Sequence, residues 1–202
     1  PQLNVYTVPA GLPQWLLIGN GGTTAGTNFI GTTDNVSLTF KVNNLRTLIF
    51  NTDESLIFGR FGTASGQGAI SGGSSVVSGA FATAFGRSVA SNQEATAIGA
   101  VGNTASGFAS SAFGVSVASA ARTFAAGLAT ASADNSQAIG FNIISNSYSE
   151  FAAGIYNDNS GSFSTNTWVG TDPVFMIGNG IASGTRNNAL RINKNGSGLI
   201  DS

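Results

Sequence analysis

Between residues 55 and 156, apolar and polar positions recur together at a nearly constant spacing. Seven times, a β-branched residue and a small or branched apolar residue precede a serine, and the steps between these motifs are 13, 13, 15, 13, 13 and 13 residues. A glycine that closes a short apolar segment recurs in phase with them. Two series at one spacing predict a solenoid, a stack of repeated units. The motifs begin at Thr63, Val76, Val89, Thr104, Val117, Thr130 and Ile143, and the glycines are Gly59, Gly73, Gly86, Gly99, Gly114, Gly127, Gly140 and Gly154.

A unit of 13 residues is too short for two helices and a turn. Its Val, Thr, Ile, Phe, Ser, Ala and Gly residues favour strands over helices. Each unit is therefore predicted to contain two short strands and two tight turns. The coil after Gly99 holds two extra residues and the coil after Gly140 holds one. We expect both insertions at turns, because an insertion within a strand would reverse the direction of every later side chain.

The strand before each closing glycine has two different faces. The residues one and three positions before the glycine trade volume, so Phe85 accompanies Thr83, whereas Ala126 accompanies Phe124. A close-packed layer conserves volume in this way. We therefore interpret this face as the interior of the coil and the opposite, alanine face as a contact with a neighbouring chain, although the reverse assignment also satisfies the pattern. The alanines are Ala84, Ala97, Ala112, Ala125, Ala138 and Ala152.

The predicted fold is all-β, with a β-solenoid of about seven or eight coils at 55–156 between two smaller modules. In the N-terminal module, 1–54, the segments S-L-T-F-K-V and R-T-L-I-F flank a turn at Asn43 and Asn44 and predict a β-hairpin. The C-terminal module, 157–202, is expected to cap the solenoid. The two modules share a motif, because the residues at 17–21 resemble those at 176–180.

Charged residues make up only 8% of the chain, against roughly 25% in ordinary soluble domains. With a net charge of −1 there is no basic stripe, so nucleic acid and anionic membrane surfaces are poor partners. No apolar run reaches the roughly 18 to 20 residues of a membrane span. A surface with so few charges would not keep a single chain soluble, so we expect apolar surface to be buried between chains. Because Pro1 is not an initiator, we also expect the chain to be a piece of a longer protein.

Candidate chemistry is sparse, because the chain contains neither histidine nor cysteine. A Ser-His-Asp or Cys-His site within one chain is therefore impossible. The adjacent Asp53 and Glu54 suggest a solvated junction more than a glycosidase pair. The run 157–161 resembles a calcium loop but lacks the later bidentate glutamate and is more typical of a turn. The glycines at 66–73 lack the Lys-Ser/Thr pair of a phosphate loop, so we predict no enzyme, metal or cofactor.

Five side chains are candidates for receptor binding. Arg60 and Arg87 each follow a closing glycine and could bind an anionic glycan or simply keep the surface soluble. Phe108, Tyr148 and Trp168 lie outside the volume-trading positions. They could stack on sugar rings or pack between chains.

The repeats carry a family resemblance. The segments T-A-I-G at 96 and R-S-V-A-S at 87 resemble the head repeats of trimeric autotransporter adhesins of the YadA type. This resemblance, which covers 55–156, implies a left-handed parallel β-roll assembled as a homotrimer. The flanks at 29–46, 172–180 and 187–196 are similar instead to tail fibres of bacteriophages and contractile injection systems.

Three functions follow as hypotheses. The first is a trimeric fibre or adhesin segment, extracellular on a virion, injection particle or bacterial surface, that binds a cell-surface receptor or glycan and adjoins another fibre or baseplate protein. The second is a carbohydrate-active or lectin-like fibre with sites between chains. The third is an ice-binding solenoid. The β-branched position argues against it, because this position alternates Thr with Val and does not form a regular threonine ladder.

Overall fold

The computed structural model describes residues 21–200, which contain eighteen β-strands and no helix. The chain divides into a unit that ends at Asn35 and a unit that begins at Val36. Turns make up the described part of the first unit, where the Thr24 carbonyl accepts hydrogen bonds from the amides of Thr27 and Asn28. The repeats lie entirely in the second unit.

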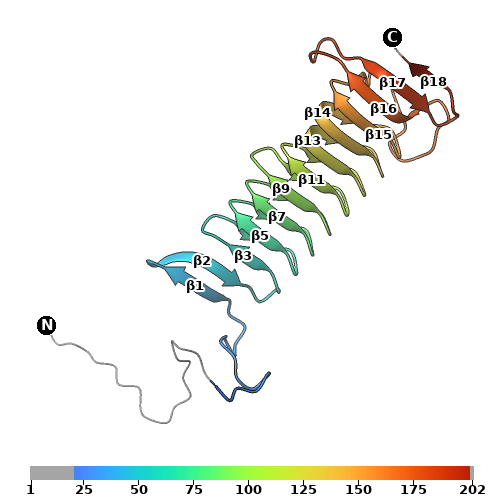
Figure 1. Cartoon of the computed structure of the whole chain (residues 1–202). Coiled ribbons are helices and arrows are strands. Elements are labelled where there is room, and N and C mark those ends of the chain that lie inside the picture. The colour runs from blue at the N-terminus through green and yellow to red at the C-terminus, as the bar shows by residue number, and fades with distance from the viewer. Residues whose placement is uncertain (1–20, 201–202) are drawn as a thin grey trace, which may run out of the picture. The chain divides into compact units, whose positions relative to one another are not determined.

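Each coil of the second unit consists of a longer strand, a tight turn and a shorter strand, as the sequence predicts (Figure 1). We call the longer strands the long-strand row and the shorter ones the short-strand row; β13 and β14 run through both. The long-strand row contains β3 (Leu56–Phe58), β5 (Ile70–Gly73), β7 (Thr83–Gly86), β9 (Thr96–Gly99), β11 (Ser111–Gly114), β13 (Phe124–Ala131), β14 (Gln137–Ser145), β15 (Phe151–Ile155) and β16 (Pro173–Asn179). The short-strand row contains β4 (Thr63–Ala64), β6 (Val76–Val77), β8 (Val89–Ala90), β10 (Thr104–Ala105) and β12 (Val117–Ala118).

Successive coils pair in parallel and in register. Gly86 pairs with Gly99, and Val76 pairs with Val89, so equivalent residues of the 13-residue unit stack directly. About eight such turns form the β-solenoid, which confirms the predicted fold class. The two extra residues after Gly99 lie in the turn before β10, as expected. The single extra residue, Asn142, lies inside strand β14 and not in a turn as expected; it forms a bulge with a φ of 54°, which keeps the later residues in register.

Antiparallel strands close both ends of the long-strand row. The hairpin of β1 (Leu38–Val42) and β2 (Leu45–Phe50) pairs with β3, and its turn lies at Asn43 and Asn44, as the sequence predicts. Both turn residues have positive φ. At the other end, β17 (Asn188–Asn193) and β18 (Gly198–Ile200) extend the sheet from β16. The repeated motif at 176–180 stacks on β15, whereas its N-terminal copy at 17–21 lies almost entirely outside the described residues.

The interior of the solenoid is the alanine face, so our preferred assignment of the two strand faces is wrong. Ala84, Ala97 and the other alanines two positions before the glycines are fully buried, and they pack against Ala90 and its equivalents from the short-strand row. Alanine fills most of this interior, and the larger side chains buried there are Val77, Ile143 and Met176. Phe85 and Ile98, which trade volume with their neighbours, point outward instead.

Volume is traded on the outer face because the coils are only about 4.8 Å apart. The Phe85 ring lies over Gly72 of the preceding coil, where a Cβ atom would overlap the ring. Side chains stacked this closely share space whether or not another layer covers them. Compensating volumes therefore indicate stacking between coils and do not identify the interior.

Buried serines satisfy the backbone at the turn that follows three of the closing glycines, Gly73, Gly86 and Gly114. The Ser88 hydroxyl lies within hydrogen-bonding distance of the Phe85 and Gly99 carbonyl oxygens, at 3.0 and 3.2 Å. Ser116 repeats these contacts with Phe113 and Gly127. A buried carbonyl without a partner would cost about 1 to 3 kcal/mol, so this serine belongs to the fold.

Candidate functional site

The outward side chains of the long-strand row form a continuous apolar surface, which we call the apolar ladder. Phe58 and Ile98 are 42% and 41% exposed, although residues of these types are usually buried. Their alignment follows from the register of the coils, because each residue stacks on the equivalent strand of the next coil. The ladder consists of Phe58, Ile70, Phe85, Ile98, Phe113, Phe124, Ile139, Phe151 and Phe175.

Aromatic contacts hold the ladder in a defined geometry. The ring centroids of Phe58 and Phe85 lie 6.4 Å apart, across the coil that contains Gly72. Those of Phe113 and Phe124 lie 5.7 Å apart. Aromatic pairs favour separations of about 4.5 to 7 Å, so the rings stabilise one another along the stack. The ladder is therefore an ordered apolar surface.

No charged residue interrupts the ladder. The outward positions from Leu56 to Ala153 on the long-strand row are apolar, glycine, threonine, serine or glutamine. The charged residues of the coils lie at the turns, as Arg87 and Glu94 do. Soluble monomers rarely expose a contiguous apolar patch larger than a few hundred Å², and such a patch commonly marks an interaction surface.

A second cluster, the C-terminal aromatic patch, brings together two of the five predicted receptor residues. The Lys194 ammonium lies 5.9 Å from the ring centroid of Tyr148 and 5.5 Å from that of Trp168. It also donates a 2.8 Å hydrogen bond to the Ser147 hydroxyl. Trp168 remains 58% exposed, so its ring is accessible to a ligand. Lys194 carries no repeat signal, and sequence analysis missed it.

Beside this patch, Glu150 is buried with only 1% of its surface exposed. Burial raises the pKa of its carboxyl to about 7. Hydrogen bonds from Ser147, Ser145 and Asn146 and the attraction of Lys194 lower this pKa, but by less than burial raises it. Its Oε2 atom accepts three hydrogen bonds of 2.9 to 3.1 Å from those residues. Burial in turn lowers the pKa of Lys194, against the attraction of Asp172 and Glu150. The turn at 145–150 is therefore linked electrostatically to the C-terminal module.

The other three predicted receptor residues remain apart from this patch. Arg60 and Arg87 are exposed at the turn after the closing glycines, two coils from each other, and the Arg60 guanidinium lies 5.1 Å from the Phe61 ring. Phe108 is exposed at the opposite turn of its coil. The structure therefore gathers these three into no common site.

The carboxylate and calcium-loop candidates have structural roles. Asp53 accepts a 3.0 Å hydrogen bond from the Ser55 amide, and hydrogen bonding to Ser55 lowers the pKa of its carboxyl. In the run 157–161, the Asn157 side chain bonds both the amide and the carbonyl of Ile144, each at 2.8 Å. It thereby pairs with β14 as a further strand would. The Asp158 carboxylate accepts a 3.0 Å hydrogen bond from the Ser160 amide.

One further apolar row escaped sequence analysis because it exists only in the C-terminal half. The residue after the closing glycine is polar or small up to Ala100, with Arg60, Ser74 and Arg87 before it. From Val115 onward it is large and exposed. This corner row consists of Val115, Leu128, Phe141 and Ile155.

Comparison of the chain with protein-family models, curated proteins and solved structures finds no match. The resemblance of the repeats to trimeric adhesin heads, and of the flanks to tail fibres, therefore stays a prediction from the sequence. In residues 21–200 no helix is long and apolar enough to cross a membrane.

Proposed function

We propose that this chain is a structural segment of a homotrimeric extracellular fibre or adhesin, carried on a virion, an injection particle or a bacterial surface. The observation that carries the proposal is the apolar ladder, a charge-free row of half-exposed aromatic and aliphatic side chains along the whole solenoid. The repeat resemblance and the fibre-like flanks support the same function. In this assembly the ladder of each copy packs against the other copies.

Burial of the ladder supplies a driving force for assembly. Transfer of apolar surface from water contributes roughly 25 cal/mol per Å², and each fully buried Phe or Ile contributes about 1.5 to 3 kcal/mol. The aligned, preorganised rows lose little side-chain freedom on association, which lowers the entropic cost. A narrow alanine-filled coil gains little stability from its own interior, so contact between copies would stabilise the fold as well.

Disulfide cross-linking tests the ladder contact, because the chain contains no native cysteine. We expect Ile98→Cys to form covalent dimers from the assembled protein under mild oxidation, since copies meet at this position. Ser91→Cys, at an exposed turn, is the matched control and should remain monomeric on a non-reducing gel. Equal cross-linking of the two variants would show that the ladder is not the contact between copies.

Receptor attachment forms the second part of the proposal. The C-terminal aromatic patch favours a glycan, because the exposed Trp168 ring and the neighbouring Tyr148 ring offer stacking surfaces beside the hydrogen-bonding Lys194. A glycan array probed with the whole chain tests this part. Binding should be lost in Trp168→Ala and retained in Phe108→Ala, and the opposite pattern would place the receptor elsewhere.

A further inference from the structure

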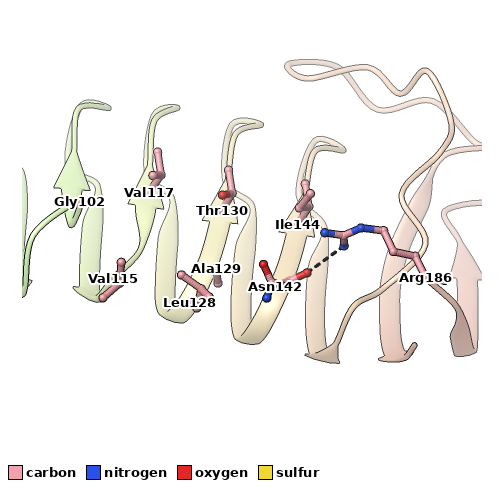
Figure 2. Close-up of a pocket in the computed structure, with 9 residues that line it drawn as sticks. All are labelled: Gly102, Val115, Val117, Leu128, Ala129, Thr130, Asn142, Ile144 and Arg186. Atoms are coloured by element: carbon pink, nitrogen blue, oxygen red, sulfur yellow. Dashed lines mark hydrogen bonds between the residues drawn. The ribbon is translucent and has the colours of Figure 1, made fainter. Parts of the chain in front are cut away.

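An open groove of about 260 Å³ lies on the outside of the short-strand row, in the C-terminal half of the solenoid (Figure 2). Its floor is apolar and comes from the corner row and the short-strand row, through Val115, Leu128, Val117 and Ile144. Three polar side chains also line it, Thr130, Asn142 and Arg186. An apolar cavity with a few convergent polar groups is the usual form of a small-ligand site.

Arg186 reaches the groove from the loop between β16 and β17 and is held in place. Its Nη1 atom donates to the carbonyls of Asn142 and Asn157, at 2.9 and 3.1 Å. Its guanidinium also lies 5.7 Å from the Tyr156 ring centroid. In Figure 2 the other terminal nitrogen points toward Ile144, along the groove. The cation is therefore preorganised with a donor directed into the cavity.

The polar groups of the groove have unused hydrogen-bonding capacity. Across residues 21–200, the hydrogen bonds of the Arg186 guanidinium go to carbonyl oxygens, and none goes to a carboxylate. In the same range, the Asn142 amide and the Thr130 hydroxyl form no hydrogen bond with the protein. Arg186 is the one charged side chain that lines the groove, so charge complementarity calls for an anionic occupant.

We propose that this groove binds a single carboxylate-bearing sugar residue of the uronic-acid type. The Arg186 guanidinium would donate a charge-assisted hydrogen bond to the carboxylate. The Asn142 amide offers both donors and an acceptor to ring hydroxyls, and Thr130 offers a hydroxyl. The C–H face of the pyranose ring would lie on the apolar floor formed by Val117, Leu128 and Ile144.

Other anionic ligands satisfy fewer of these groups. An inorganic anion would leave the apolar floor unused. A fatty acid would cover the floor but leave Thr130 and Asn142 desolvated without partners, which costs affinity. The volume lies below the roughly 300 to 1,000 Å³ of sites for drug-sized ligands, and it suits one sugar ring.

A contact made by the ladder alone would leave this groove open. The long and short strands of each coil pack together through their alanines, so their outer faces point in different directions. The inference rests on the receptor-attachment part of the proposed function and adds a second sugar-binding site, separate from the C-terminal aromatic patch. It is independent of the ladder contact itself.

The test titrates the whole chain with glucuronate and, as the neutral sugar with the same ring, with glucose. By calorimetry we expect glucuronate to bind at least about tenfold more tightly than glucose, since a hydrogen bond to a charged group is worth that much. Arg186→Gln should abolish the difference. Arg87→Gln, which removes an exposed arginine outside the groove, should preserve it.

Because Arg186 also holds two carbonyls, a second variant guards against misfolding. Asn142→Gly keeps the positive φ of the bulge and removes only the amide, and it should weaken glucuronate binding several-fold. Equal affinity for the two sugars, no binding at millimolar concentration, or equal losses in the Arg186 and Arg87 variants would each overturn the proposal. Glycan-array binding that is lost in Trp168→Ala but independent of Arg186 would refute this groove and leave the proposed function standing.

Discussion

The Phe85 ring covers Gly72 on the neighbouring coil and leaves no room there for a Cβ atom. The two residues occupy paired positions on the outer face, so the ring fills the space above the glycine and reaches the ring of Phe58 on the coil beyond. The ladder is continuous because a missing side chain on one coil is compensated by a large one on the next.

This contact predicts the effect of Gly72→Ala. The added methyl group displaces the Phe85 ring, and we expect a loss of about 1 to 3 kcal/mol in the free energy of unfolding, the usual cost of overpacking. Urea denaturation of the whole chain measures it. In a Phe85→Ala background the same substitution should cost much less, and an equal cost in both backgrounds would contradict the contact.

The alanine interior predicts that Ala97→Val is destabilising. Ala97 is fully buried between the two strand rows, and a larger side chain forces the rows apart, at a cost of about 1 to 3 kcal/mol. Ile98→Val, one residue later on the outer face, serves as the control. Ile98→Val should lose less free energy of unfolding than Ala97→Val. The reverse order would indicate that the volume-trading face is the interior.

Glu150 predicts a stability that falls as the pH rises. Its folded-state pKa of about 7 lies above the ordinary value of 4.5, so the folded state binds the proton more tightly than the unfolded state does. Unfolding free energy should therefore decrease between about pH 4.5 and 7, by roughly 3 kcal/mol at most.

In Glu150→Gln the decrease should vanish, since the uncharged amide carries no desolvated charge. The lowered pKa of Asp53 acts with the opposite sign and only below its ordinary value of 3.8, outside this window. Denaturation series at several pH values measure both proteins. A decrease of equal size in the variant would contradict the role of Glu150.

Replacement by aspartate should destabilise the fold at Asn157 but not at the nearby Asn159. Its amide donates to the Ile144 carbonyl and accepts from the Ile144 amide, so Asn157→Asp loses the donor and places a carboxylate against a carbonyl oxygen. We expect a loss of about 1 to 3 kcal/mol in unfolding free energy. Asn159→Asp, two residues later in the same turn, should be nearly neutral.

The sequence was sufficient to predict the repeated coil but not to predict which face of each strand points into the interior. The spacing of Gly86 and Gly99 predicted a stack of repeated coils, and Asn43 with Asn44 predicted the hairpin. The alternation between Ala84 and Phe85 marks two faces without saying which one is inside. That depends on the distance between the two strand rows, which a repeat spacing does not encode.

The candidate sites were still less predictable. Lys194 is 47 residues away from Ser147, and Arg186 is 44 residues away from Asn142. Each pair meets only because the C-terminal module folds back against the last coils. Tyr148 and Trp168 were recognisable as aromatics outside the repeat, but their common partner was not.

The central claim is that the apolar ladder is buried between copies of the chain, and sedimentation equilibrium at low micromolar concentration tests it most directly. We predict a mass three times that of the 20.3 kDa chain, and a single-chain mass for Ile98→Asp, because a carboxylate cannot be buried unpaired in an apolar contact. Phe81→Asn, which removes an exposed phenylalanine outside the ladder at a positive φ that Asn accepts, should keep the trimeric mass. A monomeric wild-type chain, or a trimer that survives Ile98→Asp, would contradict the claim.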